Sequence, residues 1–241
     1  MRKNFAEKIR AWFSKIGYTC DACGIEVFDY PKARLCEACE SSLYKNDGKR
    51  CGKCGRATVA EGLCLSCKKK PPVFTKGMSP FVYENLTAIL INRFKNGERH
   101  LAYFFAERMA ELLQRQNLQK ENALIVAVPL TEERELERGY NQAEELARIV
   151  GERLNVAFDK ETLVKTRDTG AQKKLSGKER QENVKGAYHV RKRKAVDGKT
   201  VVLIDDIMTT GATGSECARV LKNAGAKEVI FLTAVSLKEI K

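Results

Sequence analysis

The sequence predicts an α/β fold, in which a doubly wound and mostly parallel sheet follows a small cysteine-rich domain. Apolar runs at 124–128, 201–204 and 228–235 alternate with segments of helical spacing and short loops, a pattern typical of parallel strands covered by helices on both faces. Eight of the nine cysteines form four Cys-x-x-Cys pairs before residue 70. A basic, proline-containing stretch at 68–72 marks the change in composition between the two parts.

The expected elements can be justified in chain order. Residues 1–17 place apolar side chains at helical spacing, which predicts an amphipathic helix. Residues 18–70 hold the cysteine pairs, and the α/β domain is expected over 77–241. Its pattern predicts five strands, at 80–83 (an edge strand), 124–128, 162–165, 201–204 and 228–235. Helical spacing is present in the stripe of Leu86, Ile89, Leu90 and Phe94, over 101–113, at 143–154, and over 211–225, where Gly225 ends the helix. A polar loop is expected over 166–185.

The cysteine pairs have the spacing of zinc knuckles, in which two thiolates lie at the tip of one turn. Consecutive pairing would enclose twelve residues between Cys23 and Cys36 and nine between Cys54 and Cys64, and both gaps suit a zinc ribbon. A double ribbon with two structural Zn²⁺ sites is therefore expected, and an interleaved arrangement is the alternative. The ligands would be Cys20, Cys23, Cys36, Cys39, Cys51, Cys54, Cys64 and Cys67.

The segment 201–213 predicts a site for a sugar phosphate. A buried strand is followed by two acids and then by a loop of small and hydroxylated residues that opens a helix. Backbone N–H groups and the helix dipole bind phosphate at such a junction, and the carboxylates can accept hydrogen bonds from sugar hydroxyls or contact Mg²⁺. The candidate residues are Asp205, Asp206, Thr209, Thr210, Gly211, Ala212 and Thr213.

Two further groups of donors are candidates for binding pyrophosphate. One follows the strand that ends at Val128, and the other lies in the polar loop, which could close over a ligand as a lid or could simply be a solvated basic loop. The first group is Arg134, Arg138, Asn141 and Gln142, and the second is Arg167, Gln172 and Arg180.

The chain of 241 residues carries a formal charge of +13, which favours a polyanionic partner such as nucleic acid. Each four-thiolate zinc site would contribute −2, so two sites lower this charge to about +9. Five basic residues around the knuckles could contact phosphates, namely Arg34, Lys49, Arg50, Lys53 and Arg56. Reduced cysteines and the lack of a signal peptide or membrane span predict the cytoplasm, and the 1–17 helix either packs on the protein or lies on an acidic membrane surface.

The residues Val201 to Thr213 resemble the signature by which type I phosphoribosyltransferases bind 5-phosphoribosyl-1-pyrophosphate (PRPP). The resemblance implies that Asp205 and Asp206 hold the ribose 2′ and 3′ hydroxyls, and that residues 209–213 hold the 5′-phosphate. The order of the motifs along the whole chain is similar to that of the ComF (ComFC) family. These motifs are the four knuckles, Phe94-Lys95 before Gly97, Val128-Pro129-Leu130, Arg138 to Gln142, Thr169 with Gln172, Arg180 with Asn183, and the PRPP loop.

Membership of that family implies a role in natural transformation, with single-stranded DNA handled in the cytoplasm beside a membrane translocation apparatus and a ComFA-type helicase as partner. Two functions are compatible with the residues: a PRPP-binding accessory protein of DNA uptake, and an active phosphoribosyltransferase. The sequence identifies no acceptor and no catalytic residue. A third alternative, a zinc-ribbon module with a degenerate enzyme domain, would not bind PRPP.

Overall fold

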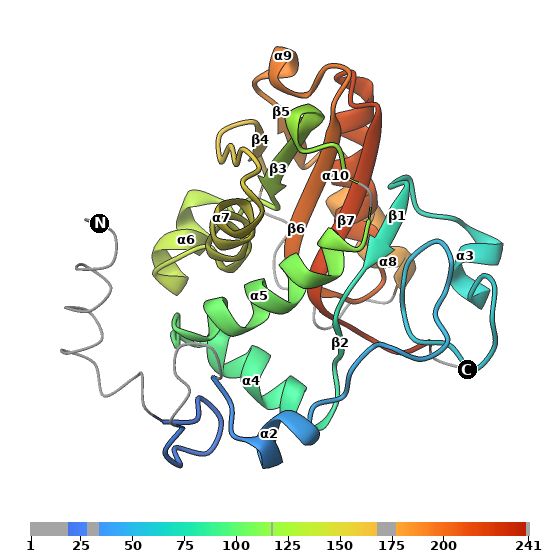
Figure 1. The fold of residues 1–241 in the computed structure, drawn as a ribbon. Helices are drawn as coiled ribbons and strands as arrows, with labels where there is room; N and C mark the ends of the chain where they lie inside the picture. The colour runs from blue at the N-terminus through green and yellow to red at the C-terminus, as the bar shows by residue number, and fades with distance from the viewer. Residues whose placement is uncertain (1–18, 28–33, 117, 168–176, 240–241) are drawn as a thin grey trace.

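The structure is a computed structural model that describes residues 19–27, 34–116, 118–167 and 177–239, apart from the side chains of 177, 178, 180 and 181 (Figure 1). The helix predicted at 1–17 lies outside the described residues, and the membrane association suggested for it lies there as well.

A five-stranded parallel sheet forms the centre of the α/β domain. Its strands are β1 (Lys76–Met78), β2 (Phe81–Val82), β3 (Ala123–Ala127), β6 (Thr200–Met208) and β7 (Glu228–Ser236). The order is β1-β7-β6-β3, and β2 pairs with the later part of β7. The predicted edge strand at 80–83 is thus present as β2. The sequence pattern did not indicate β1, which precedes it in the chain.

Helices cover both faces of this sheet, as predicted. Helices α4 (Asn85–Lys95), α5 (Leu101–Gln114) and α7 (Gln142–Leu154) lie on one face, and α10 (Ala212–Asn223) packs on β6 and β7 from the other (Figure 1). The remaining elements are the helices α2 (Glu37–Ser41), α3 (Leu65–Lys69), η1 (Lys120–Asn122), α6 (Glu132–Arg138), α8 (Gly177–Val184) and α9 (Arg193–Val196), and the strands β4 (Leu163–Lys165) and β5 (Tyr188–Val190). This is the fold class expected from the alternating pattern.

The end of α10 confirms the stop signal read at Gly225. Gly225 adopts a φ of 107°, and its amide donates to the carbonyl of Lys222 at 3.0 Å. The amide of Ala226 donates to the carbonyl of Leu221 at 3.1 Å. This pair of bonds satisfies the last carbonyls of the helix and turns the chain directly into β7.

Four details differ from the prediction. The apolar run at 201–204 is only the first buried part of a nine-residue strand that continues to Met208. Strand β4 joins β5 in a separate antiparallel pair, and the polar stretch after it contains α8. Ile89 is 56% exposed, although its spacing placed it on the buried stripe of α4. Helix α6 was not predicted, because it is short and almost entirely charged.

No helix within the described residues is both long enough and apolar enough to cross a membrane.

Candidate functional site

The eight knuckle cysteines gather in two clusters, and the pairing is consecutive. Cys20, Cys23, Cys36 and Cys39 form the first cluster, and Cys51, Cys54, Cys64 and Cys67 form the second. The Sγ atoms of Cys23 and Cys36 are 3.7 Å apart, as are those of Cys54 and Cys64. A tetrahedral shell with Zn–S bonds of about 2.3 Å requires S···S distances of about 3.8 Å, so both clusters fit Zn²⁺.

Backbone groups of the second cluster favour thiolates. Amides of Cys54 and Cys64 donate to Sγ of Cys51 at 3.5 and 3.3 Å. Burial raises the pKa of the Cys51 thiol, but these backbone donors outweigh burial and lower the pKa to about 6. These donors stabilise the thiolate form of Cys51, which is the form that binds a metal ion.

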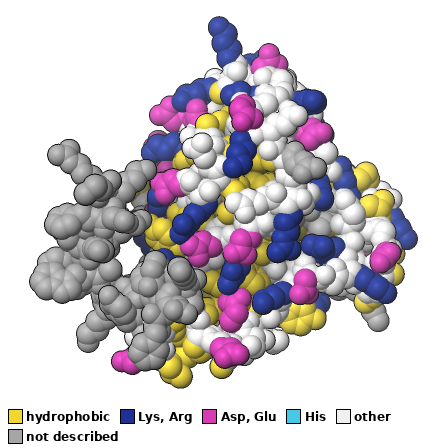
Figure 2. Space-filling model, viewed as in Figure 1, with side chains coloured by type: hydrophobic (Ala, Val, Ile, Leu, Met, Phe, Trp, Pro, Cys, Tyr) yellow, Lys and Arg dark blue, Asp and Glu magenta, His cyan; other side chains and the backbone are white. Residues whose placement is uncertain are grey.

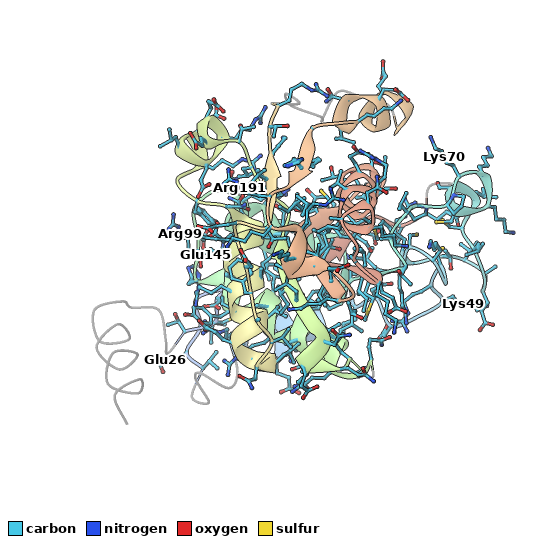
Figure 3. All side chains as sticks on the ribbon, turned by 90° about the horizontal axis from the view of Figure 1, so that it is seen from above. Glu26, Lys49, Lys70, Arg99, Glu145 and Arg191 are labelled. Carbon is cyan, nitrogen blue, oxygen red and sulfur yellow. The ribbon has the colours of Figure 1, made fainter. Side chains whose placement is uncertain are left out.

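The two clusters lie at different sides of the α/β domain. In Figure 3, Glu26 of the first cluster region lies apart from Lys49 and Lys70, which flank the second. The second cluster packs directly on the sheet, because the amide of Gly77 in β1 donates to the carbonyl of Lys53 at 2.8 Å. The approach is so close that a Cβ atom on Gly55 would lie 2.2 Å from the carbonyl oxygen of Gly77.

Asp205 and Asp206 lie within β6, beyond the point where its neighbour β3 has ended. The last β3 partner is Ala127, opposite Ile204, so the acids project from the carboxyl edge of the sheet. The sequence had placed them after the strand. The amide of Asp206 donates to Oδ1 of Asp205 at 2.9 Å, and Nζ of Lys95, the last residue of α4, lies 3.1 Å from Oδ2 of Asp206.

The electrostatics of this pair are unfavourable in the absence of a bound cation or hydroxyl. Burial and, after it, the neighbouring Asp206 carboxylate raise the pKa of Asp205 to about 8, against the opposing effects of the Asp206 amide, Lys95 and Arg138. Two acids that compete for charge at one sheet edge are typical of a ligand site.

The loop after β6 presents backbone donors beside the acids. Gly211 adopts a φ of 78°, which an L side chain rarely accepts, and precedes the first residue of α10. The first helical bond runs from the Ser215 amide to the Gly211 carbonyl at 2.8 Å, and the Ala212 amide donates to Oγ1 of Thr210 at 3.3 Å. Helix geometry therefore leaves the amides of Thr213 and Gly214 without intrahelical acceptors, pointing out of the N-terminus.

The predicted donors after β3 divide into two kinds. Asn141 is buried and caps α7, with Oδ1 accepting from the Ala143 amide at 3.0 Å while Nδ2 donates to the Val128 carbonyl at 3.2 Å. Gln142 is also buried and donates to the Lys95 carbonyl at 3.4 Å. These amides hold the loop in place, whereas Arg138 is exposed at the end of α6.

Arg134 and Arg138 lie on α6, and Arg138 donates to Oε1 of Gln142 at 3.3 Å. In the polar stretch, Arg167 is exposed and donates to the carbonyls of Asn183 and Lys185 at 2.9 and 3.2 Å, at the end of α8. Gln172 lies outside the described residues. Arg180 falls within α8, but its side chain is not among those described.

Sequence reasoning gave no role to two residues that the fold brings to the site. One is Lys95, whose only signal was its place in the Phe94-Lys95 motif. The other is Tyr188 of β5, which is buried and whose pKa is raised by burial and by the charges of Cys217 and Asp205. No local pattern marked Tyr188.

The prediction that Arg34 and Arg56 could contact phosphates is wrong, because Arg34 is only 9% exposed and Arg56 only 8%. Arg56 instead contacts the second cysteine cluster and the loop after β6.

Comparisons with known proteins agree with this architecture. A protein-family model of the phosphoribosyl transferase domain matches residues 105–239. The DNA utilization protein YhgH of Escherichia coli O157:H7 is 31% identical over 201 residues, which cover 81% of this chain and 87% of that protein. Competence protein F of Haemophilus influenzae is 29% identical over 207 residues (82% and 88%), and competence protein ComFC of Bacillus subtilis is 27% identical over 202 residues (81% and 80%). The chain belongs to the ComF family of competence-related proteins, in which a type I phosphoribosyltransferase domain follows cysteine clusters that fit a zinc ribbon.

Proposed function

We propose that this protein binds PRPP, together with Mg²⁺, at the carboxyl end of β6. The observation that carries the proposal is the position of Asp205 and Asp206 directly before the 209–213 loop, at the sheet edge where α10 begins. A phosphate can accept from the Thr213 and Gly214 amides and from the threonine hydroxyls, while the carboxylates accept from adjacent ribose hydroxyls.

The surrounding cations favour a polyanionic ligand. Lys95 reduces the negative charge of the acid pair, which would otherwise repel phosphates. We assign pyrophosphate binding to Arg138 and Arg134, with Arg167, Gln172 and Arg180 contributing from a segment that folds over the ligand. Asn141 and Gln142 would act by holding the segment after β3 in place, since their amides already donate to the carbonyls of Val128 and Lys95.

Calorimetric titration with PRPP and Mg²⁺ tests the proposal. The Asp205→Asn/Asp206→Asn variant should bind at least roughly tenfold more weakly, because hydrogen bonds to charged acceptors contribute about 1.5–3 kcal/mol. The exposed residues Asp47 and Glu61 provide a matched control, Asp47→Asn/Glu61→Gln, which removes the same charge and should bind as the wild type does. Absence of binding by the wild-type protein would refute the proposal.

Whether the bound PRPP reacts is a separate question. Transfer of the phosphoribosyl group requires orientation of the acceptor and stabilisation of the leaving pyrophosphate, and the arginines named above could provide the second. Pyrophosphate release should be measured with bases, nucleosides and DNA ends as acceptors. Release with one of them identifies an active transferase, and no release with any of them favours the accessory role.

We further propose that the protein handles incoming single-stranded DNA in the cytoplasm during natural transformation, with a ComFA-type helicase as partner and contact with the inner membrane face. The support is its similarity to proteins named for competence and DNA utilization, together with its net positive charge. On the face shown in Figure 2, Lys and Arg side chains are interspersed with Asp and Glu.

Fluorescence anisotropy of a labelled single-stranded oligonucleotide tests the DNA proposal. Affinity should fall steeply between 50 and 200 mM salt, by roughly tenfold or more, because phosphate contacts release counterions. Equal binding at both salt concentrations would contradict a phosphate-tracking surface.

A further inference from the structure

One buried side chain joins the second cysteine cluster to the loop after β6. Nε of Arg56 donates to Sγ of Cys54 at 3.4 Å, and Nη2 lies 3.9 Å from Sγ of Cys64. On its other side, Nη1 donates to the carbonyl oxygen of Thr209 at 3.1 Å. A single guanidinium therefore contacts two metal-ligand positions and the first residue of the candidate phosphate loop.

The surroundings explain why this guanidinium can be buried. An isolated buried charge is strongly unfavourable, whereas a Zn²⁺ ion with four thiolates carries a net charge of −2. Arg56 is thus the counter-ion of the second cluster.

The contact with Thr209 constrains the loop. Since the peptide group is planar, fixing the carbonyl of Thr209 also fixes the direction of the N–H group of Thr210. The Thr209 carbonyl would be the acceptor for the Thr213 amide if α10 began two residues earlier, and Arg56 donates to it instead. The guanidinium therefore helps to set where α10 starts and which amides point out of its N-terminus.

The second cluster cannot easily move away from the loop as a unit. Besides the packing of Gly55 on Gly77, the amide of Val73 donates to Oγ of Ser215 in α10 at 3.0 Å. The amide of Glu239 donates to the carbonyl of Ala57 at 3.1 Å, and its carboxylate accepts from the amide of Leu65. The second cluster is therefore held beside the loop by contacts that do not depend on Arg56.

We propose that Arg56 is a positioning residue that couples the second zinc–thiolate cluster to the 209–213 loop, so that the loop binds a sugar phosphate tightly only while the cluster and Arg56 are intact. This inference rests on the proposed function, namely that the loop binds the 5′-phosphate of PRPP.

The test uses the full-length, zinc-loaded protein and the variants Arg56→Gln and Arg56→Lys. Lysine keeps the charge but has no fork with which to contact the thiolates and the Thr209 carbonyl together. The matched control is Arg115→Gln, because Arg115 is exposed and lines a surface hollow with Cys51 and Gly55. Three quantities are measured: zinc per chain, affinity for ribose 5-phosphate by calorimetry, and amide hydrogen exchange of residues 209–215.

We expect both Arg56 variants to hold two zinc ions, to bind ribose 5-phosphate roughly tenfold more weakly and to exchange faster at 209–215, because each loses a charged hydrogen bond to the loop. Arg115→Gln should match the wild type in all three. If Arg56→Gln loses zinc, the Arg56→Lys variant alone tests the proposal. Wild-type affinity and exchange in a zinc-replete Arg56→Lys protein would overturn the proposal, and so would loss of zinc from both variants, since Arg56 would then only retain the metal.

Failure of the proposed function has a different signature. If the wild-type protein binds neither PRPP nor ribose 5-phosphate, the assignment of the ligand is wrong. The exchange measurement still decides the coupling in that case: faster exchange at 209–215 in Arg56→Lys supports it, and unchanged exchange overturns it.

Discussion

The two cysteine clusters have the same ligands and the same Cys-x-x-Cys spacing, yet they are joined differently to the α/β domain. In the first cluster Cys23 is exposed and Cys36 and Cys39 are partly so, whereas every cysteine of the second is buried. The first cluster contacts α4 through Arg93, whose Nη1 donates to the Ala22 carbonyl at 3.2 Å. The second packs on β1 and contacts the 209–213 loop through Arg56.

The difference shows that a local metal motif does not determine what the metal stabilises. Each cluster can order its own short segment, because four thiolates around one ion bring two turns together. The first reaches the α/β domain mainly through side chains, among them the buried Asp21, which lies 3.9 Å from His100, and Arg34, which lies over the Tyr103 ring. The second has a backbone interface with β1 and places a buried guanidinium on the Thr209 carbonyl. We therefore expect the first cluster to act mainly as a local support and the second to contribute to the candidate site.

The largest expected difference comes from removing one ligand of each cluster. Cys36→Ser and Cys64→Ser change equivalent positions, the first cysteine of the second knuckle. Each should lose one zinc ion, but Cys64→Ser should lower the free energy of unfolding of the α/β domain more, on the order of several kcal/mol, because the buried Arg56 loses its counter-ion. Metal analysis and thermal unfolding measure this, and equal shifts in Tm would contradict the comparison.

A smaller and more local difference is expected at the two knuckle glycines. Gly24 and Gly55 each follow the second cysteine of a knuckle, with φ of 79° and 72°. Alanine at Gly24 meets nothing within 4 Å and should cost about 1–2 kcal/mol for the left-handed conformation.

Gly55→Ala adds a collision with the Gly77 carbonyl in β1 and should cost roughly 2 kcal/mol more, in the range of overpacked sites. Chemical denaturation of both variants measures the two free energies of unfolding. If Gly24→Ala is as costly as Gly55→Ala, the docking of the second cluster on the sheet is not a tight interface.

A pH-dependent effect tests whether ionisation of Asp205, in the candidate site, destabilises the folded protein. The pKa of Asp205 is about 8 in the folded protein and about 3.9 in an unfolded chain, so the folded state holds a proton that the unfolded state has lost. The contribution of Asp205 to the free energy of unfolding is therefore greatest below pH 4. It falls as the pH rises towards 8 and changes no further above that value.

Asp205→Asn should remove this dependence and be more stable than the wild type at pH 9, by about 1–3 kcal/mol after allowance for partial solvent exposure. Urea denaturation between pH 4 and pH 9 measures the difference. The exposed Asp47→Asn variant is the control and should keep the wild-type slope. A wild-type slope in Asp205→Asn would show that another group titrates.

The smallest effect is expected at Arg93, the contact of the first cluster with α4. Arg93 also pairs with Glu98 at 2.6 Å, and both side chains are about one-third exposed. Arg93→Gln should change the free energy of unfolding by less than about 1 kcal/mol, as is usual for exposed pairs, and should change PRPP affinity less than Arg56→Gln does. Calorimetry on the two variants side by side checks this, and a larger effect from Arg93 would reverse the ranking of the clusters.

The sequence predicted the parts of the fold that depend on neighbouring residues. The short gaps favoured consecutive cysteine pairing but left the interleaved alternative open, and the structure shows the consecutive one. The strand-loop-helix unit of 201–225 followed from an apolar run, small loop residues and a helical stripe. The pattern erred where burial depends on distant elements. The apolar run ended at Ile204, but hydrogen bonds to β7 carry β6 on to Met208.

Pairings across long stretches of sequence were decided only by the tertiary structure. Arg56 and Thr209 are 153 residues apart, and neither position shows that one bonds the other. The approach of Lys95 to Asp206 and the antiparallel pairing of β4 with β5 are of the same kind.

The amino-acid sequence thus determined the fold class, the two cysteine clusters and the loop that opens α10, because spacing and local backbone preferences act over a few residues. The tertiary structure decided which polar side chains bond within the protein and which can contact a ligand. It alone connects the second cluster to that loop. The physical reason is that a buried charge or amide takes whichever partner the packed chain brings within hydrogen-bond distance.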